Sequence, residues 1–263
     1  TDIRHGTRVH FQPNSQYFEK RLSLEHLKKI LQTKALLARG LKITLKQIDS
    51  EDLVWHYPDG LRHYFKDHLE GQCVFDEPWS LDIEEESMAL TCYIQWSSVE
   101  RMTASYVNLI PTIQGGTHVQ AVRQGLLEGL REFLKIQGQE GKDKVALEDL
   151  TCGLNFILSL KMHDPNFIGQ TKEKLSSPQI VQPLMMRFKN SFLGWLLKHR
   201  DLAHRLKKFV DENKAQRLAH QKIIEIKKFT VSKFPPKLAD CSSKNFLERE
   251  IFLVEGDSAG SSA

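Results

Sequence analysis

The chain has 263 residues, with 37 Lys and Arg against 33 Asp and Glu and a hydrophobic content of 40%. This composition excludes a wholly disordered chain, a collagen and a coiled-coil rod, and the length allows one large domain or two small ones. No stretch approaches the roughly 18 apolar residues that a membrane span needs, and we expect no signal peptide. Four cysteines far apart, without a C-x-x-C pair, favour reduced thiols in a cytoplasmic protein.

The first third of the chain predicts mixed strands and helices. Residues 7–12 alternate like an edge strand, and Ser23 is placed to cap a helix whose apolar residues recur at three- and four-residue spacings. A strand over 41–45 follows, and a Pro-Asp-Gly turn then leads into a short helix over 61–69. This early β-α-β order indicates an α/β domain.

The next part of the chain predicts two strands and a long helix. We expect the strands, over 90–96 and 104–110, to form a hairpin. Thr117 and Gln120 have the spacing of a capping box, in which the two side chains each satisfy a free backbone N–H at the start of a helix. An apolar stripe follows, and Gly138 is expected to end the helix.

A second helical region follows a short helix over 147–153 and a strand over 156–162. Ser177 has the character of an N-cap, with Pro178 at the first helical position. Pro183 lies inside the apolar pattern that follows, so it should kink the helix or delay its start.

The end of this helical region is basic. Residues 198–228 contain ten Lys and Arg against four acids. Such a helix suits a polyanion such as DNA, and a solvated Lys-rich face is the alternative. Pro235-Pro236 marks a linker, and 251–254 reads as a strand running into a Gly-rich turn. The pattern therefore predicts an α/β domain, a long helical arm and the opening of a second domain.

A loop after the strand at 156–162 carries Gln170 and Lys172. In an extended loop, an amide and an ammonium group two residues apart reach the same side and are able to hold a terminal phosphate. A merely solvated lysine is the alternative, and no G-x-x-x-x-G-K-[ST] motif is present.

Two carboxylates, Glu255 and Asp257, follow the last predicted strand. A carboxylate at a strand end suits a Mg²⁺ ligand or a general acid–base group, and acids at a helix N-terminus are the alternative. Lys237, just before that strand, is either a contact for a backbone phosphate or a surface lysine. The eleven histidines show no metal-ligand spacing.

Four segments together resemble one family. Ser105-Tyr-Val-Asn-Leu-Ile-Pro-Thr followed by Gln114-Gly-Gly-Thr-His resembles the transducer region of the B subunits of bacterial type II topoisomerases. Gln170-Thr-Lys with Leu175-Ser-Ser resembles that family's loop that reaches the γ-phosphate of ATP. The segments 237–241 and 255–260 resemble the start of its TOPRIM domain. The four segments occur in the family's order. The residue sequence of the first segment is closer to topoisomerase IV than to gyrase.

The resemblance implies roles for individual residues. Lys172 would contact the γ-phosphate of ATP held by a preceding ATPase domain, with Gln170 assisting. Glu255 would be the general acid or the Mg²⁺ ligand for DNA cleavage and religation. The residues that would contact DNA are Lys237, Asp257 and Ser258.

The resemblance also implies an architecture and partners. Residues 1–177 would form a transducer domain with the fold of ribosomal protein S5 domain 2, 178–232 its long helical arm, and 233–263 a linker and the truncated start of a TOPRIM domain. The chain would couple ATP hydrolysis to DNA strand passage, with ATP and Mg²⁺ as cofactors that need domains outside it. Its partners would be the topoisomerase IV A subunit, DNA and, through the ATPase domain, a second copy.

Two limits accompany this interpretation. The chain lacks the family's other ATPase and cleavage motifs, so we expect it neither to hydrolyse ATP nor to cut DNA alone. The alternatives are a gyrase B subunit or a transducer-type interaction module without chemistry of its own, as in chaperone or mismatch-repair relatives of the GHKL ATPase class. The E-G-D-S-A-G segment favours the enzyme, because those relatives have no TOPRIM domain following.

Overall fold

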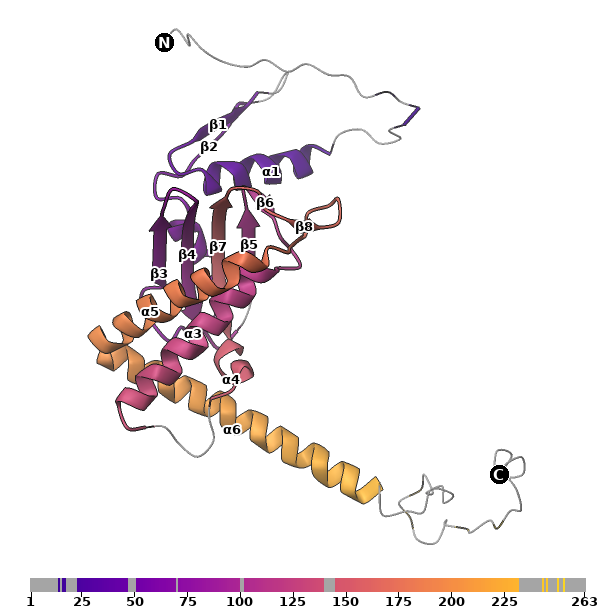
Figure 1. Ribbon diagram of the computed structural model, residues 1–263. Helices are drawn as coiled ribbons and strands as arrows, with labels where there is room; N and C mark the ends of the chain where they lie inside the picture. The colour runs from indigo at the N-terminus through magenta and orange to yellow at the C-terminus, as the bar shows by residue number, and fades with distance from the viewer. Residues whose placement is uncertain are drawn as a thin grey trace. The chain divides into compact units, whose positions relative to one another are not determined.

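A five-stranded mixed sheet organises the first of two compact units, Thr1–Asn213 and Lys214–Ala263 (Figure 1). This computed structural model describes residues 14, 16–17, 23–46, 51–69, 71–99, 102–139, 145–231, 243, 245, 250 and 253. All neighbouring strands of the sheet are antiparallel except β5 and β7, which run parallel. In order across the sheet, the strands are β3 (Trp79–Glu84), β4 (Met88–Trp96), β7 (Leu154–Met162), β5 (Thr103–Val107) and β6 (Ile110–Pro111).

The expected hairpin between the strands at 90–96 and 104–110 is wrong. Strand β7 lies between β4 and β5 and pairs with both of them. Every residue of β7 from Leu154 to Leu160 is buried. A strand buried on both faces is most stable in the centre of a sheet, where it has a neighbour on each side, so it separates two strands that are close in sequence.

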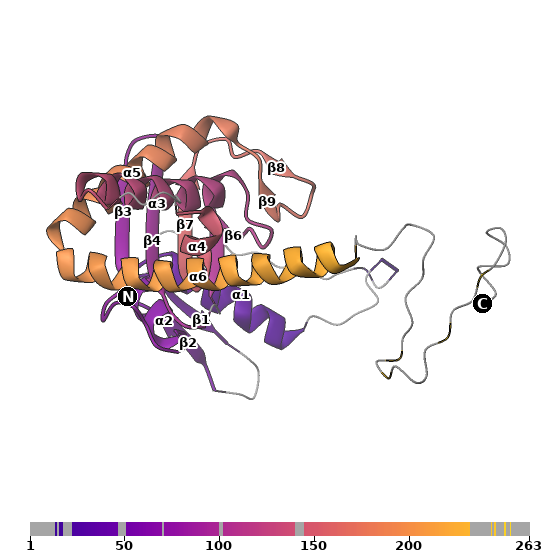
Figure 2. The same cartoon turned by 90° about the horizontal axis from the view of Figure 1, so that it is seen from below.

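Helices cover the two faces of the sheet (Figure 2). On one face, helices α3 and α5 pack on the alternate β7 side chains Phe156, Leu158 and Leu160. On the other face, α1 and α2 form a smaller core with Ile157. The helices that flank the sheet are α1 (Leu24–Leu37), α2 (Leu61–Asp67), α3 (Thr117–Ile136), α4 (Leu147–Thr151) and α5 (Val181–Lys198). A separate two-stranded ribbon joins β1 (Lys42–Leu45) to β2 (Leu53–His56).

Helices α3 and α5 approach each other closely at Gly125. A Cβ at this position would lie 2.6 Å from the carbonyl oxygen of Met185 and 2.7 Å from Cβ of Phe188. Glycine at such a contact allows two helix backbones to pack closer than larger residues permit. The pair therefore forms one rigid layer over the sheet.

Several predicted helix ends are confirmed. The Ser23 hydroxyl accepts a hydrogen bond from the backbone N–H of His26 at the start of α1. The predicted strand at 41–45, helix at 61–69, helix at 147–153 and strand at 156–162 correspond to β1, α2, α4 and β7. Gly138 follows α3 with a φ of 65°, in the left-handed region that favours glycine.

The predicted capping box of Thr117 is wrong, whereas Ser177 precedes a helical turn with Pro178 at its first position, as predicted, although its side chain forms no capping hydrogen bond. Helix α3 begins after Gly116 without a side-chain cap, because the Thr117 hydroxyl accepts from the N–H of Ser177 instead. Ser177 is followed by a 3₁₀ turn, η1 (Pro178–Ile180), and α5 begins only at Val181, so the delay expected from Pro183 is confirmed. Both hydroxyls serve contacts between segments, which local spacing does not reveal.

The basic helix α6 (Arg200–Val231) starts after a break at His199. Its first part, within the first unit, buries Ala203, Leu206 and Val210 in the main core. Residues 214–231 of the second unit are helical. Within the described part of the chain, no helix is long and apolar enough to cross a membrane.

Some predicted features lie outside the described residues. They are the strand at 7–12, the linker at Pro235-Pro236, the strand at 251–254 apart from residue 253, and the site residues Lys237, Glu255, Asp257 and Ser258.

Candidate functional site

The predicted phosphate-binding loop is a small hairpin that projects beyond the end of the sheet near β6 (Figures 1 and 2). Its strands are β8 (Phe167–Ile168) and β9 (Lys174–Leu175). Gln170 and Lys172 lie in the turn between them, and both side chains are exposed. The sequence therefore correctly predicted an accessible loop, but not its two short strands.

The ammonium group of Lys172 has no carboxylate partner among the described residues. This ammonium group lies over the ring of Phe167, whose centroid is 5.9 Å from Nζ. Lys172 has a φ of 57°, a left-handed conformation that is uncommon for a residue with a side chain. The turn thus holds an unpaired cation over an aromatic ring, where it is available to an anion.

Hydrogen bonds join this hairpin to the Gln114–Gly116 segment. The backbone N–H of Gln114 donates to the carbonyl of Glu173 at 3.0 Å, and the Gln114 side-chain amide donates to the Glu173 carboxylate at 2.7 Å. The N–H of Leu175 donates to the carbonyl of Gly115 at 3.0 Å. The base of the hairpin is therefore fixed to the residues that immediately precede α3.

A second set of contacts connects the hairpin to α3 and α5. Ser177 donates its N–H to the Thr117 hydroxyl at 3.2 Å and accepts at its own hydroxyl from the N–H of Asn166 at 3.0 Å. Thr117 is the first residue of α3, and Ser177 directly precedes the turn that leads into α5. A displacement of the hairpin would consequently move the residues at the start of both helices.

A buried polar chain lies under this junction. The Thr112 hydroxyl donates to the carbonyl of Ser105 at 2.9 Å, and Nε2 of His118 is 3.1 Å from the same hydroxyl oxygen. Because that hydroxyl gives its proton to Ser105, His118 donates from Nε2 and its Nδ1 is the unprotonated nitrogen. Nδ1 is buried without a hydrogen-bond partner among the described residues. Burial lowers the pKa of His118 to about 4, so the imidazole is neutral at pH 7.

Arg123 was missed by the sequence analysis. It lies on α3 beside a pocket of about 440 Å³ that Gln114, Gln120 and Gln124 help to line. Its buried Nε has no hydrogen-bond partner in the described part of the chain, and no ion pair is recorded for it there. The signal was an arginine next to Val122 in the apolar stripe of the helix, where a charge needs compensation.

The basic helix is only partly neutralised within the first unit. Lys207 pairs with Asp211 at 2.6 Å, and Arg205 pairs with the exposed Asp76 at 3.3 Å. Exposed pairs of this kind contribute little stability and are easily exchanged for other anions. The charge pattern is thus compatible with both alternatives of the sequence analysis, a helix that binds a polyanion and a solvated Lys-rich face.

The described residues contain no group of three His, Cys, Asp or Glu side chains arranged to hold a metal ion. Cys73, Cys92 and Cys152 are free thiols. Of the predicted site residues, the structure brings together Gln170 and Lys172, and the others are outside its described part.

Comparisons with known proteins agree with this architecture. The family model for DNA gyrase B matches residues 60–225. The B subunit of DNA topoisomerase 4 from Pseudomonas aeruginosa is 40% identical over 98% of this chain and 42% of its own length. The B subunit of DNA gyrase from Streptococcus pyogenes is 33% identical over 100% of this chain and 42% of its own length. The chain therefore spans about two fifths of the length of these curated relatives.

A solved structure is similar as well. The topoisomerase IV ATP binding domain of Francisella tularensis, determined with a small-molecule inhibitor, superposes with a TM-score of 0.70 at 28% identity, covering 78% of this chain and 57% of that one. The family model covers more than half of the chain, and the relatives include both topoisomerase IV and gyrase B subunits. The chain therefore belongs to the DNA gyrase B family of type II topoisomerase B subunits.

Proposed function

We propose that the chain is the central part of a topoisomerase IV B subunit and couples ATP binding and hydrolysis to DNA strand passage in decatenation and relaxation. The observation that carries this proposal is the exposed Lys172, which has no ion pair with any residue that the structure describes, on a hairpin that is hydrogen-bonded to the start of α3. A cation in this position senses an anion outside the chain and transmits its presence to a rigid helical layer. The identity to topoisomerase IV B subunits supports this subtype over gyrase, which stays the alternative.

The proposed domain organisation follows the family. Residues 1–177 form the transducer domain with the fold of ribosomal protein S5 domain 2, and 178–232 form its helical arm. Residues 233–263 form a linker and the start of a TOPRIM domain. The mixed sheet with α3 on one face supports the first assignment, and the long α6 supports the second.

The coupling mechanism depends on Lys172 and Gln170. Both side chains are exposed and fit a terminal phosphate, since the ammonium group lacks a carboxylate partner among the described residues. When ATP is bound by the domain before this chain, its γ-phosphate supplies the missing negative charge. Lys172 and Gln170 then hold the hairpin in one position, and they release it when that charge leaves. Gln114, Thr117 and Ser177 carry the displacement to α3 and α5.

The proposed DNA-cleavage role belongs to the end of the chain. Glu255 acts as the general acid or as a ligand of Mg²⁺, which supplies charge stabilisation for strand cleavage when bound. Lys237, Asp257 and Ser258 contact DNA in this proposal. Further acids and the A subunit complete the cleavage site, and the B subunit dimerises through its ATPase domain in the cytoplasm.

Replacing Lys172 by alanine tests the proposal. In the full-length B subunit with its A subunit, ATP turnover is expected to fall at least about tenfold, because one charge-assisted contact to the phosphate is lost. DNA binding is expected to stay unchanged. Steady-state ATP hydrolysis and a DNA-binding titration measure the two effects.

Lys174→Ala is the matched control. Lys174 is an exposed lysine of the same hairpin, two residues away on β9. It should retain wild-type turnover. Equal turnover in the Lys172→Ala variant and the wild type would refute the phosphate contact and favour an interaction module.

A further inference from the structure

The sheet face that carries α1 and α2 has an apolar and a polar part. The side chains of Tyr93, Tyr106 and Ile157 pack in the smaller core under these helices. Farther along β7, the same face presents Ser159 and Lys161. A central strand therefore changes from an apolar to a polar surface while it is still in the middle of the sheet.

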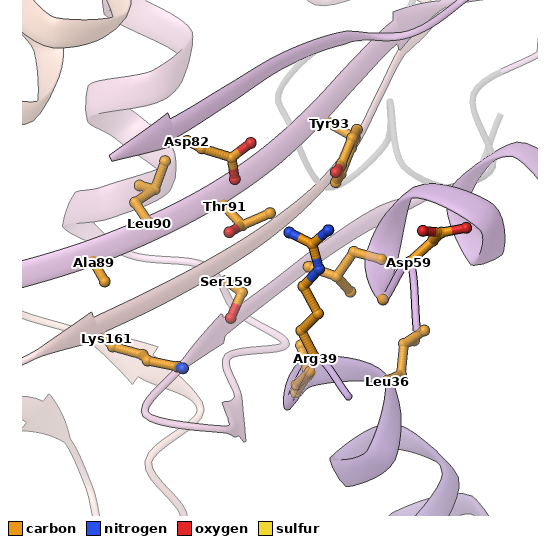
Figure 3. Close-up of a pocket in the computed structure, with 13 residues that line it drawn as sticks. Leu36, Arg39, Asp59, Asp82, Ala89, Leu90, Thr91, Tyr93, Ser159 and Lys161 are labelled. Atoms are coloured by element: carbon orange, nitrogen blue, oxygen red, sulfur yellow. The ribbon is translucent and has the colours of Figure 1, made fainter. Parts of the chain in front are cut away.

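A cavity of about 130 Å³ lies over this polar part of the sheet (Figure 3). Asp82, Thr91 and Ser159 face one another across β3, β4 and β7, because Asp82 pairs with Thr91 and Thr91 with Ser159 in the strand register. The figure shows the Arg39 guanidinium entering from the end of α1 and Lys161 at the opposite side of Ser159. The cavity is smaller than the roughly 300–1,000 Å³ of drug-sized ligand pockets, which favours a small ion or headgroup.

Ser159 is the least expected member of this group. It is only 6% exposed, and its hydroxyl makes no hydrogen bond to any described residue. The Ser159 oxygen keeps some solvent-accessible surface, because it is not among the described side-chain atoms that are fully buried without a hydrogen-bond partner. Its hydroxyl therefore opens into the cavity, where it offers a donor to a ligand.

Two exposed cations, Arg39 and Lys161, line the cavity. Neither Arg39 nor Lys161 forms a salt bridge with a described residue. Nε of Arg39 donates to the carbonyl of Pro58 at 3.3 Å, which orients the guanidinium and leaves its two terminal amines for other acceptors. Cations on both sides of a free hydroxyl form the donor set that oxyanions prefer.

The carboxylate of Asp82 restricts which anions are able to bind in the cavity. Its carboxylate points to the same cavity beside Thr91 and has no ion pair among the described residues. A fully ionised oxyanion such as sulfate would be repelled by it, whereas an oxyanion with its own proton donates a hydrogen bond to it. We propose that this cavity binds hydrogen phosphate, either free or as the terminal group of a phosphate monoester, with Arg39, Lys161 and Ser159 on its oxygens and its hydroxyl on Asp82.

Binding there would join two layers of the protein. Arg39 follows the end of α1, whereas Ser159 and Lys161 belong to the central strand of the sheet. A phosphate between them crosslinks the layer of α1 and α2 to the sheet, so the folded state gains stability with phosphate concentration. This site is separate from the Lys172 hairpin, and its test does not depend on ATP turnover.

The test is a titration of the 263-residue chain with inorganic phosphate, glycerol 3-phosphate, sulfate and sodium chloride at equal ionic strength and pH 6, where the phosphate and a large share of the monoester carry a proton. Calorimetry measures binding and thermal unfolding measures stability. Inorganic phosphate at about ten times its Kd is expected to raise Tm by roughly 4 °C. Sulfate and chloride are expected to have no such effect. Stronger binding of glycerol 3-phosphate than of phosphate would identify a monoester site, and the reverse would identify a site for the free ion.

Variants locate the site. Ser159→Ala should weaken phosphate binding about tenfold, and Arg39→Gln more than tenfold, while Lys135→Gln, a change of an exposed lysine at the end of α3, should have no effect. Asp82→Asn should allow sulfate to bind. The proposal is overturned if phosphate stabilises no more than chloride does, if Arg39→Gln binds phosphate like the wild type, or if sulfate binds the wild type as well as phosphate.

Discussion

Replacing Gly116 by alanine is expected to lower the free energy of unfolding by about 4 kcal/mol and to separate the Lys172 hairpin from the start of α3. Gly116 precedes α3 with a φ of 133° and forms a bridge to Leu175 on β9. A Cβ there would lie 2.2 Å from the carbonyl oxygen of Leu175 and 2.6 Å from its nitrogen. Backbone atoms cannot rotate away as side chains do, so the two segments must part. Urea unfolding and amide exchange at Leu175 measure the two effects.

Gly169→Ala is the control for the conformational part of this effect. Gly169 lies in the turn of the same hairpin with a φ of 78°, and a Cβ there meets nothing within 4 Å. Its replacement should cost only about 1 kcal/mol, which is the strain of a left-handed alanine. If the two variants lose the same stability, the contact between Gly116 and Leu175 does not fix the hairpin, and the proposed route from Lys172 to α3 is wrong.

Local patterns predicted the helices and many strands well. Ser23 was a correct N-cap because its partner, His26, is only three residues away. The break before Val181 followed from Pro183, whose ring restricts the chain locally. Strand β3 was missed, although Trp79 to Glu84 alternate strictly between apolar and polar residues.

Long-range pairing explains the errors. In the strand order β4-β7-β5, Leu158 of β7 pairs with Cys92 on one side and with Ser105 on the other. No short-range sequence signal encodes such neighbours. The Thr117 hydroxyl was expected to cap its own helix, but it accepts from Ser177, 60 residues away. Competition between a local and a distant hydrogen bond is decided by the tertiary structure.

The candidate sites divide in the same way. Gln170 and Lys172 are two residues apart, so a loop motif was enough to predict that they lie in one accessible loop. Arg39 and Ser159 line one cavity because the end of α1 packs in the same small core as β7, and a sequence pattern does not show this cavity. Arg123 has a local signal, a charge in an apolar stripe, but its missing partner is visible only in the structure.

The buried imidazole of His118 is expected to make the free energy of unfolding strongly dependent on pH. Its pKa is about 4 in the folded protein and about 6.5 when exposed, because burial disfavours the charged form. Between these pH values the unfolded chain binds a proton that the folded chain does not, so stability falls as the pH falls through this window. The loss reaches about 3 kcal/mol at pH 4.

His118→Gln isolates this contribution, because the glutamine amide keeps a donor for the Thr112 hydroxyl but does not titrate. Urea unfolding, followed by tryptophan fluorescence at pH 7, 6, 5 and 4, should give a steeper decline for the wild type than for this variant, with a difference of about 3 kcal/mol over the range. His26→Gln removes an exposed histidine of α1 and should leave the wild-type slope unchanged. Parallel curves for the wild type and His118→Gln would mean that the imidazole is solvated or partnered in the folded protein, and the neutral Ser105–Thr112–His118 chain beneath the hairpin would have to be abandoned.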